Sequence, residues 1–223
     1  MDPFKPFNSK VEDRIEVDGT LVFRNVRLSY PHIFRPFSQQ GGEPRFSMAG
    51  IANLPAEQRQ KMVEIIRALI KRRLGEKGNI PADRWFLRNG DDTGKAENAG
   101  CLVFNASEKP DNRPAVYNRF GVTTASEAEV YAGCMVDAII RPWIQDNSFG
   151  KRVNASLVAV KFVGDNTPFG APPVDVASVF GVAAGQELPA PEPEGLVDDG
   201  NWSAPTDRDA PPADGDKLDN PFA

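Results

Sequence analysis

Five short apolar or alternating runs and a single amphipathic segment restrict the fold of this chain more than any other feature. Such runs, separated by turns rich in Pro, Gly and Asn, are typical of β-strands. The segment from about 55 to 74 is the one clear helix: Met62, Ile66 and Leu69 repeat at helical spacing, Pro55 opens it and Gly75 follows it. The runs predict strands at 20–30, 45–53, 101–107, 134–145 and 151–163.

This order of elements predicts a mainly β fold. Five strands with one long helix between the second and the third fit a five-stranded antiparallel barrel of the OB type, which leaves few open edges. A doubly wound parallel sheet would need more crossover helices than the single one predicted. Residues 1–19 are polar and lack periodicity, so we expect a flexible N-terminal arm followed by the barrel domain at 20–182.

Charge is distributed unevenly along the 223 residues, whose formal net charge is −5. Residues 186–223 carry ten acidic and two basic side chains, a net charge of −8, whereas residues 1–185 carry +3. Seven of the 20 prolines lie in the same final segment. This composition cannot bury enough apolar surface to offset chain entropy, so we predict a disordered, acidic, Pro-rich tail at 186–223.

Several classes of protein are disfavoured. The chain has no apolar run long enough to span a membrane and no secretory leader pattern, so we expect a soluble, cytoplasmic protein. Cys101 and Cys134 lie in apolar surroundings without metal-ligand spacing and are interpreted as buried free thiols. With one histidine, His32, and no phosphate-binding loop, the sequence predicts no metal and no cofactor.

An enzymatic function finds little support. His32 is far from any G-x-S-x-G motif, which the chain lacks, so a nucleophile with a histidine base is not predicted. A Mg²⁺-dependent nuclease using Asp91 and Asp92, or Glu127 and Glu129, stays open as an alternative, although such acidic pairs are common in solvated turns. A small β-barrel protein-interaction or virion assembly factor, without nucleic-acid binding, is a further alternative.

Aromatic and basic residues alternate throughout the body, and this is the strongest functional signal. Single-stranded nucleic acid needs both types, because bases stack on exposed rings while cations follow the phosphates. The pattern includes Tyr30, Phe37, Trp85 and Phe86, and we expect at least half of all the rings, among them Phe104, to be core. We predict DNA contacts at Phe34, Arg35, Arg45, Arg88, Arg113, Tyr117, Arg141, Trp143, Lys151 and Arg152.

Two charged segments remain. The basic last turn of the predicted helix, Lys71 to Arg73, either complements the helix dipole or contacts a ligand. The end of the chain, KLDNPFA, places an aromatic anchor next to acidic side chains. We predict that Asp219, Pro221 and Phe222 dock on a basic, apolar pocket of another protein, and that the tail acids compete for the cationic groove of the body.

The chain also resembles a known family. Its segments VRLSYPHIFRPF, GEPRFSMAGIANL, RNGDD, YAGCMVDAIIRPWIQ and GKRVNASL are similar to those of phage-encoded single-stranded DNA-binding proteins with an OB-fold and an acidic tail, over residues 20–182. The terminal LDNPFA is similar to the acidic tip of bacterial single-stranded DNA-binding proteins. The resemblance implies a non-enzymatic protein that coats single-stranded DNA in phage replication, recombination and repair, and recruits partners through its tail in the infected host.

Overall fold

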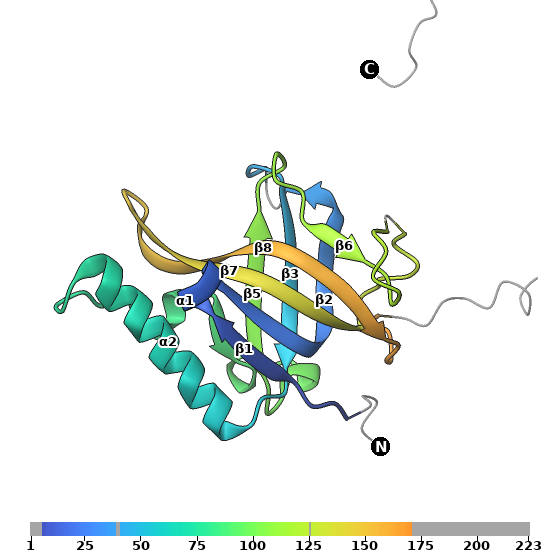
Figure 1. Cartoon of the computed structure of the whole chain (residues 1–223), viewed down its shortest axis with the longest axis horizontal. Helices are drawn as coiled ribbons and strands as arrows, with labels where there is room; N and C mark the ends of the chain where they lie inside the picture. The colour runs from blue at the N-terminus through green and yellow to red at the C-terminus, as the bar shows by residue number, and fades with distance from the viewer. Residues whose placement is uncertain (1–5, 39–40, 125, 171–223) are drawn as a thin grey trace, which may run out of the picture. The chain divides into compact units, whose positions relative to one another are not determined.

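The computed structural model describes residues 6–38, 41–124 and 126–170 (Figure 1). The chain divides into two units, Met1–Pro172 and Pro173–Ala223, and the second lies outside the described residues. The tail predicted at 186–223, with Asp219, Pro221 and Phe222, therefore also lies outside them. No helix among the described residues is long and apolar enough to cross a membrane.

The described chain is mainly β, as predicted. Its helices are a single turn, α1 (Ile15–Asp18), and the long α2 (Ala56–Leu74), which matches the helix expected from about 55 to 74. Three 3₁₀ turns lie between α2 and β5. The strands are β1 (Lys10–Arg14), β2 (Thr20–Phe37), β3 (Arg45–Ala52), β4 (Leu87–Asn89), β5 (Leu102–Glu108), β6 (Ala115–Tyr117), β7 (Met135–Asn147) and β8 (Gly150–Gly164).

All eight strands form one sheet in the order β4-β5-β3-β2-β7-β8-β6, with β1 also paired to β2. Every pairing is antiparallel except that of β6 with β8. The predicted number of five strands is therefore wrong, because β1, β4 and β6 are too short or too polar to give a hydrophobic pattern. Although three strands separate β5 from β8 in this order, the two contact each other, so the sheet curls around its core.

Strand β2 is longer than predicted. The sequence pattern ended it at Pro31, but the strand continues to Phe37 with irregular pairing to β3 around His32. Proline lacks a backbone N–H and is tolerated in strands at such irregularities. Two residues of β2, Asn25 and Tyr30, have positive φ angles, 52° and 47°, and each lies where the register of β2 shifts against a neighbouring strand.

The N-terminal segment was predicted to be an irregular arm up to residue 19, but residues 10–18 form β1 and α1. Strand β1 pairs with β2 from Lys10 opposite Arg24 to Arg14 opposite Thr20. Most of its side chains are exposed, so no apolar face marks it as a strand. Backbone pairing and polar contacts hold it, and neither leaves a periodic pattern in the sequence.

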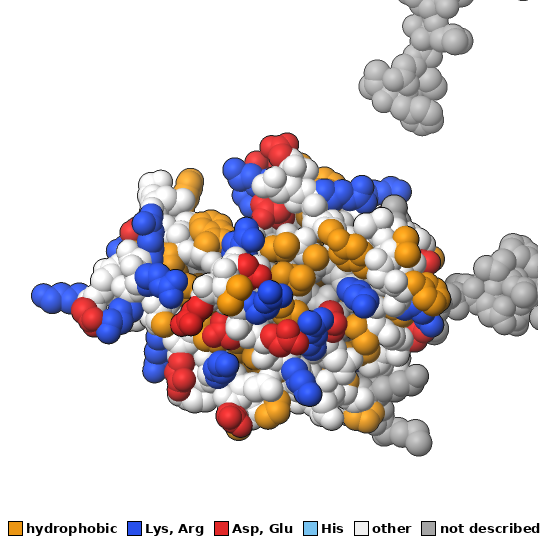
Figure 2. Space-filling view, viewed as in Figure 1, with side chains coloured by type: hydrophobic (Ala, Val, Ile, Leu, Met, Phe, Trp, Pro, Cys, Tyr) orange, Lys and Arg blue, Asp and Glu red, His pale blue; other side chains and the backbone are white. Residues whose placement is uncertain are grey.

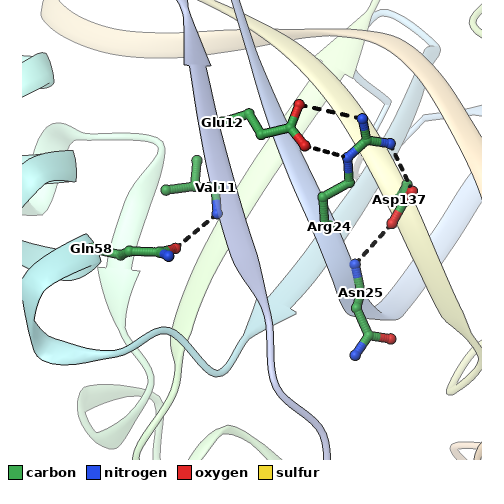
Figure 3. A network of polar contacts seen from close by, with 6 residues as sticks. All are labelled: Val11, Glu12, Arg24, Asn25, Gln58 and Asp137. Atoms are coloured by element: carbon green, nitrogen blue, oxygen red, sulfur yellow. Dashed lines mark hydrogen bonds and ion pairs between the residues drawn. The ribbon is translucent and has the colours of Figure 1, made fainter.

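A polar network ties β1 to the rest of the sheet (Figure 3). Arg24 donates from Nε to Glu12 (2.9 Å) and from Nη1 to Asp137 of β7 (2.9 Å), so one guanidinium joins three strands. Hydrogen bonding to Arg24 lowers the pKa of Glu12. The backbone N–H of Val11 donates to the side chain of Gln58 in α2 (2.9 Å). These contacts fix the edge of the sheet on which α2 begins.

The core lies inside the curled sheet and under α2, whose buried residues are Met62, Ile66 and Ile70. Phe104 of β5 is fully buried and stacks on Phe23 of β2, with ring centroids 4.2 Å apart. Its ring lies directly over Gly50 of β3, where an added Cβ would come within 2.2 Å of the Phe104 Cζ. A glycine at this position therefore makes room for the largest aromatic contact in the sheet interior.

Three buried polar or reactive groups have structural roles. Cys101 and Cys134 are buried free thiols, as predicted, and burial raises the pKa of Cys134 to about 12. Arg27 is fully buried beneath the Phe169 ring, with its Cζ 4.0 Å from the ring centroid. It donates to the carbonyls of Gly133 and Thr167, so it holds the last described segment against β2.

Candidate nucleic-acid interface

A groove of about 820 Å³ crosses the outer surface of β3 and β5. Its floor consists of small residues on these paired strands, with Ser47 opposite Ser107 and Ala49 opposite Asn105. Its sides come from the second half of β2, the segment before β4, and the first residues of β8. Small floor residues leave the groove open to a flat or elongated ligand.

Four arginines from different parts of the fold meet in this groove. Arg45 begins β3, Arg84 precedes β4, Arg88 lies in β4 and Arg152 in β8. Glu43, which forms an ion pair with Arg45 (3.1 Å), is the one acidic residue lining the groove. Within the described part of the chain, the other three arginines form no ion pair. The groove therefore presents uncompensated positive charge to a polyanion.

Aromatic rings line the same groove. His32 and Phe37 of β2 stack on each other, with centroids 4.4 Å apart and planes 11° apart, and Phe37 is 52% exposed. Trp85 lies on the opposite side, and its indole N–H donates to the carbonyl of Ile80 (2.9 Å), which fixes the ring. Flat rings beside guanidinium groups are the combination that stacks bases and follows phosphates.

Tyr30 lies at the edge of the groove with an unusual backbone. Its φ of 47° is in the left-handed region, which disfavours bulky side chains, yet its ring is 60% exposed and adds little to the core. Asn25, the other positive-φ residue of β2, is of a type that tolerates this conformation. Strain at an exposed tyrosine points to a role for the ring outside the core.

A second cleft of about 750 Å³ adjoins the groove and shares Tyr30 and His32 with it. The segment from Thr167 to Gly170 lines this cleft as well. The ammonium group of Lys95 lies 4.6 Å from the centroid of the Tyr30 ring and hydrogen-bonds the Tyr30 hydroxyl, which raises the pKa of Lys95. Tyr30 thus stands between two hollows with a cation against its face.

The structure brings together three of the predicted DNA contacts, Arg45, Arg88 and Arg152, in the groove. Trp143 lies one strand further: it is opposite Asn154, a groove residue, on the same face of the β7–β8 ladder, and is 43% exposed. Residues directly opposite in an antiparallel pair point to the same side of the sheet. The Trp143 ring therefore extends the groove surface onto β7.

The other predicted residues lie elsewhere. Phe34 and Arg35 line a different cleft, where Arg35 pairs with Glu127 (3.4 Å). Tyr117 lines a small cleft with Arg24 and Lys161, on the β6 side of β8. Arg113 is exposed before β6, Arg141 is exposed on β7, and Lys151 lies at the β7–β8 turn, 3.7 Å from Asp146. The structure does not bring these residues into one site.

Five groove residues were absent from the predicted contacts: Tyr30, His32, Phe37, Arg84 and Trp85. Three of them belong to the aromatic and basic pattern of the sequence, so that signal was present but did not rank them. His32 was considered only as a catalytic base. Arg84 and Trp85 lie in a loop-rich segment, and they reach the groove because Trp85 bridges to Val153 of β8.

The acidic pairs considered for Mg²⁺ have structural contacts. Asp91 accepts a hydrogen bond from the backbone N–H of Gly100 (2.7 Å), which closes the loop between β4 and β5. Glu127 pairs with Arg35, as described above. Among the described residues, no three metal-binding side chains come together. These acids therefore have local roles in turns and in a surface ion pair.

Comparison with known proteins identifies relatives. The family model described as "Enterobacter phage Enc34, ssDNA-binding protein" matches residues 19–188. The solved structure of the single-stranded DNA-binding protein from bacteriophage Enc34 in complex with ssDNA is 32% identical over 69% of this chain and 91% of that chain, with a TM-score of 0.61. A C-terminal truncation of the Enc34 protein is 33% identical over 69% and 90%, with a TM-score of 0.59.

A further structure of the Enc34 protein is 31% identical over 74% of this chain and 91% of that chain, with a TM-score of 0.57. No curated protein matches the sequence. The predicted resemblance to phage single-stranded DNA-binding proteins is confirmed, and the family's description agrees with a binding protein rather than an enzyme. The chain belongs to the family of phage single-stranded DNA-binding proteins represented by that of phage Enc34.

Proposed function

We propose that this protein binds single-stranded DNA without sequence preference, in the groove over β3 and β5. The observation that carries the proposal is the meeting of four arginines with exposed rings in one groove, in a chain whose relative was solved with ssDNA. Arg45, Arg84, Arg88 and Arg152 follow the phosphates, while Tyr30, the His32–Phe37 pair and Trp85 stack bases. Stacking accepts every base, so this arrangement gives little sequence selectivity.

The architecture supports an OB-type interpretation of the five long strands. In the order β5-β3-β2-β7-β8, the two outer strands contact each other, and the backbone N–H of Asn105 donates to the carbonyl of Phe86 (2.9 Å) beside this contact. OB-folds bind single strands across the face of their second and third strands. Here those are β3 and β5, which form the groove floor.

Biological roles follow from the family. We infer that the protein coats single-stranded DNA during phage replication, recombination and repair, in the cytoplasm of an infected bacterium. The acidic residues at 186–223 compete with DNA for the groove, and Asp219, Pro221 and Phe222 recruit partner proteins. DNA contact stays a prediction for Trp143 and Arg141 on β7, and for Phe34, Arg35, Arg113, Tyr117 and Lys151, which lie outside the groove.

Titration of oligo-dT with the full chain and with a 1–185 truncation, across a range of salt concentrations, tests the proposal. Four groove arginines predict that log affinity falls with log salt at a slope of about −3, at roughly 0.7 per phosphate. Removing the −8 tail is expected to tighten binding most at low salt, where its acids compete best.

Undetectable or salt-insensitive binding by both forms would contradict the proposal and favour the protein-interaction alternative. Equal affinities of the two forms at low salt would show that the tail does not compete for DNA, while leaving DNA binding itself established. The two parts of the proposal are thus tested separately.

Tyr30→Ala is expected to weaken oligo-dT binding by about 1–3 kcal/mol, because it removes a stacking ring without removing a groove charge. Tyr30→Phe keeps the ring and loses only the hydroxyl bonded to Lys95, so its affinity should stay close to that of the unaltered protein. Fluorescence titration measures both. Equal losses in the two variants would assign the effect to the hydroxyl and Lys95 rather than to stacking.

A further inference from the structure

The C-terminal end of α2 and the loop after it carry a second concentration of positive charge. Arg67, Lys71, Arg72, Arg73 and Lys77 are all exposed. Lys71 pairs with Glu76 (2.7 Å), and within the described chain the other four form no ion pair. Figure 2 shows Lys and Arg side chains gathered on the left of the molecule, where Figure 1 places the end of α2 and the β7–β8 hairpin.

Helix dipole complementarity accounts for only part of this charge. The dipole effect acts within the last turn of a helix and contributes about 0.3–1 kcal/mol per charge. Arg67 lies about two turns before the end of α2 at Leu74, and Lys77 lies beyond it. Clustering of Arg67 and Lys77 with Arg72 and Arg73 therefore needs another explanation.

The cluster is continuous with the groove through Trp85. A cleft of about 360 Å³ is lined by Arg67 and Ile70 of α2, by residues 78–82, and by Trp85, which also lines the groove. Arg84, beside Trp85, has its Nη1 3.3 Å from where a Cβ on Gly150 would stand, at the tip of the β7–β8 hairpin. Positive charge thus extends from the groove, past Trp85, to the end of α2.

We infer that the basic cluster of Arg67, Arg72, Arg73 and Lys77 is a second phosphate-binding surface, which holds single-stranded DNA after it leaves the groove past Trp85. This inference rests on the proposed function and extends it: a strand that fills only the groove does not reach α2, whereas a longer strand does. The cluster adds affinity and salt dependence to long strands only, because it supplies charges and no exposed ring.

The test uses the full chain with Arg67→Gln/Arg72→Gln/Arg73→Gln and an oligo-dT series from about 4 to about 16 nucleotides, the range of OB-fold site sizes. Glutamine is a good helix former, so exposed positions of α2 tolerate it. The variant should match the unaltered protein on the shortest oligonucleotides and bind the longest more weakly. Its salt slope on the longest should be smaller by about 2, at roughly 0.7 per phosphate.

A control variant with the same change in net charge is Lys10→Gln/Lys61→Gln/Lys161→Gln, at exposed positions away from the cluster. Length-dependent loss confined to the α2 variant supports the inference. Equal losses in both variants, or none at any length, overturn it, and oligo-dT binding by the unaltered protein still reports separately on the proposed function. The inference is also overturned if the α2 variant keeps long-oligonucleotide affinity but loses binding to a peptide of residues 186–223.

Discussion

Replacing Arg45, Arg88 and Arg152 together with alanine is expected to weaken oligo-dT binding by roughly two to three orders of magnitude at about 0.05 M salt. Loss of three phosphate contacts lowers the salt slope by about 2, at roughly 0.7 each, so the defect grows as salt is diluted. These residues lie in β3, β4 and β8, and each is exposed to solvent or only partly covered, so the fold should persist. Fluorescence titration at several salt concentrations measures the slope directly.

The matched control replaces Arg14, Arg119 and Lys161, three exposed bases outside the groove, with alanine. It removes the same net charge, so any effect of overall charge appears in both variants. If the control loses as much affinity as the groove variant, binding depends on the net charge of the body and not on the groove.

Phe104→Ala is expected to lower the free energy of unfolding by about 3–5 kcal/mol, the usual loss for a buried aromatic ring. Phe104 is fully buried, stacks on Phe23 and covers Gly50, so its removal leaves a cavity between three strands. Urea denaturation of the isolated protein measures the loss. Phe104→Leu, which fills part of the space, should lose less.

Gly50→Ala gives an independent check of the same contact. The new Cβ would meet the Phe104 ring, so Gly50→Ala should destabilise the unaltered protein strongly and the Phe104→Ala variant much less. Neighbouring residues in direct contact usually show coupling energies of about 0.5–3 kcal/mol. Additive effects of the two substitutions would mean that ring and glycine do not pack as described.

Hydrophobic periodicity predicted the long elements of the fold. Strands β3, β5, β7 and β8 and helix α2 lie close to their predicted ranges, because each buries an apolar face or stripe. Strand β1 was missed because its exposed side chains make no apolar face, and β4 and β6 because three residues cannot show a period. The continuation of β2 beyond Pro31 depends on a local irregularity that the sequence pattern does not express.

The candidate site was predicted by residue type but only partly by residue position. Arg88 and Arg152 meet because β5 and β8 approach each other when the sheet curls, and this contact depends on strand order rather than on any local pattern. Tyr117 carries an equally plausible ring, but its strand β6 lies beyond β8, where it lines another cleft. Choosing among similar aromatic and basic residues therefore required the pairing of distant strands.

The left-handed backbone of Tyr30 has a consequence for how this protein responds to selection. Residues forced into such conformations cost about 1–3 kcal/mol, so glycine or asparagine at this position would relieve strain and raise the melting temperature. A library screened for thermostability alone would therefore enrich Tyr30→Gly and Tyr30→Asn. The same library screened for growth of the phage would keep tyrosine, so position 30 separates fitness for folding from fitness for function.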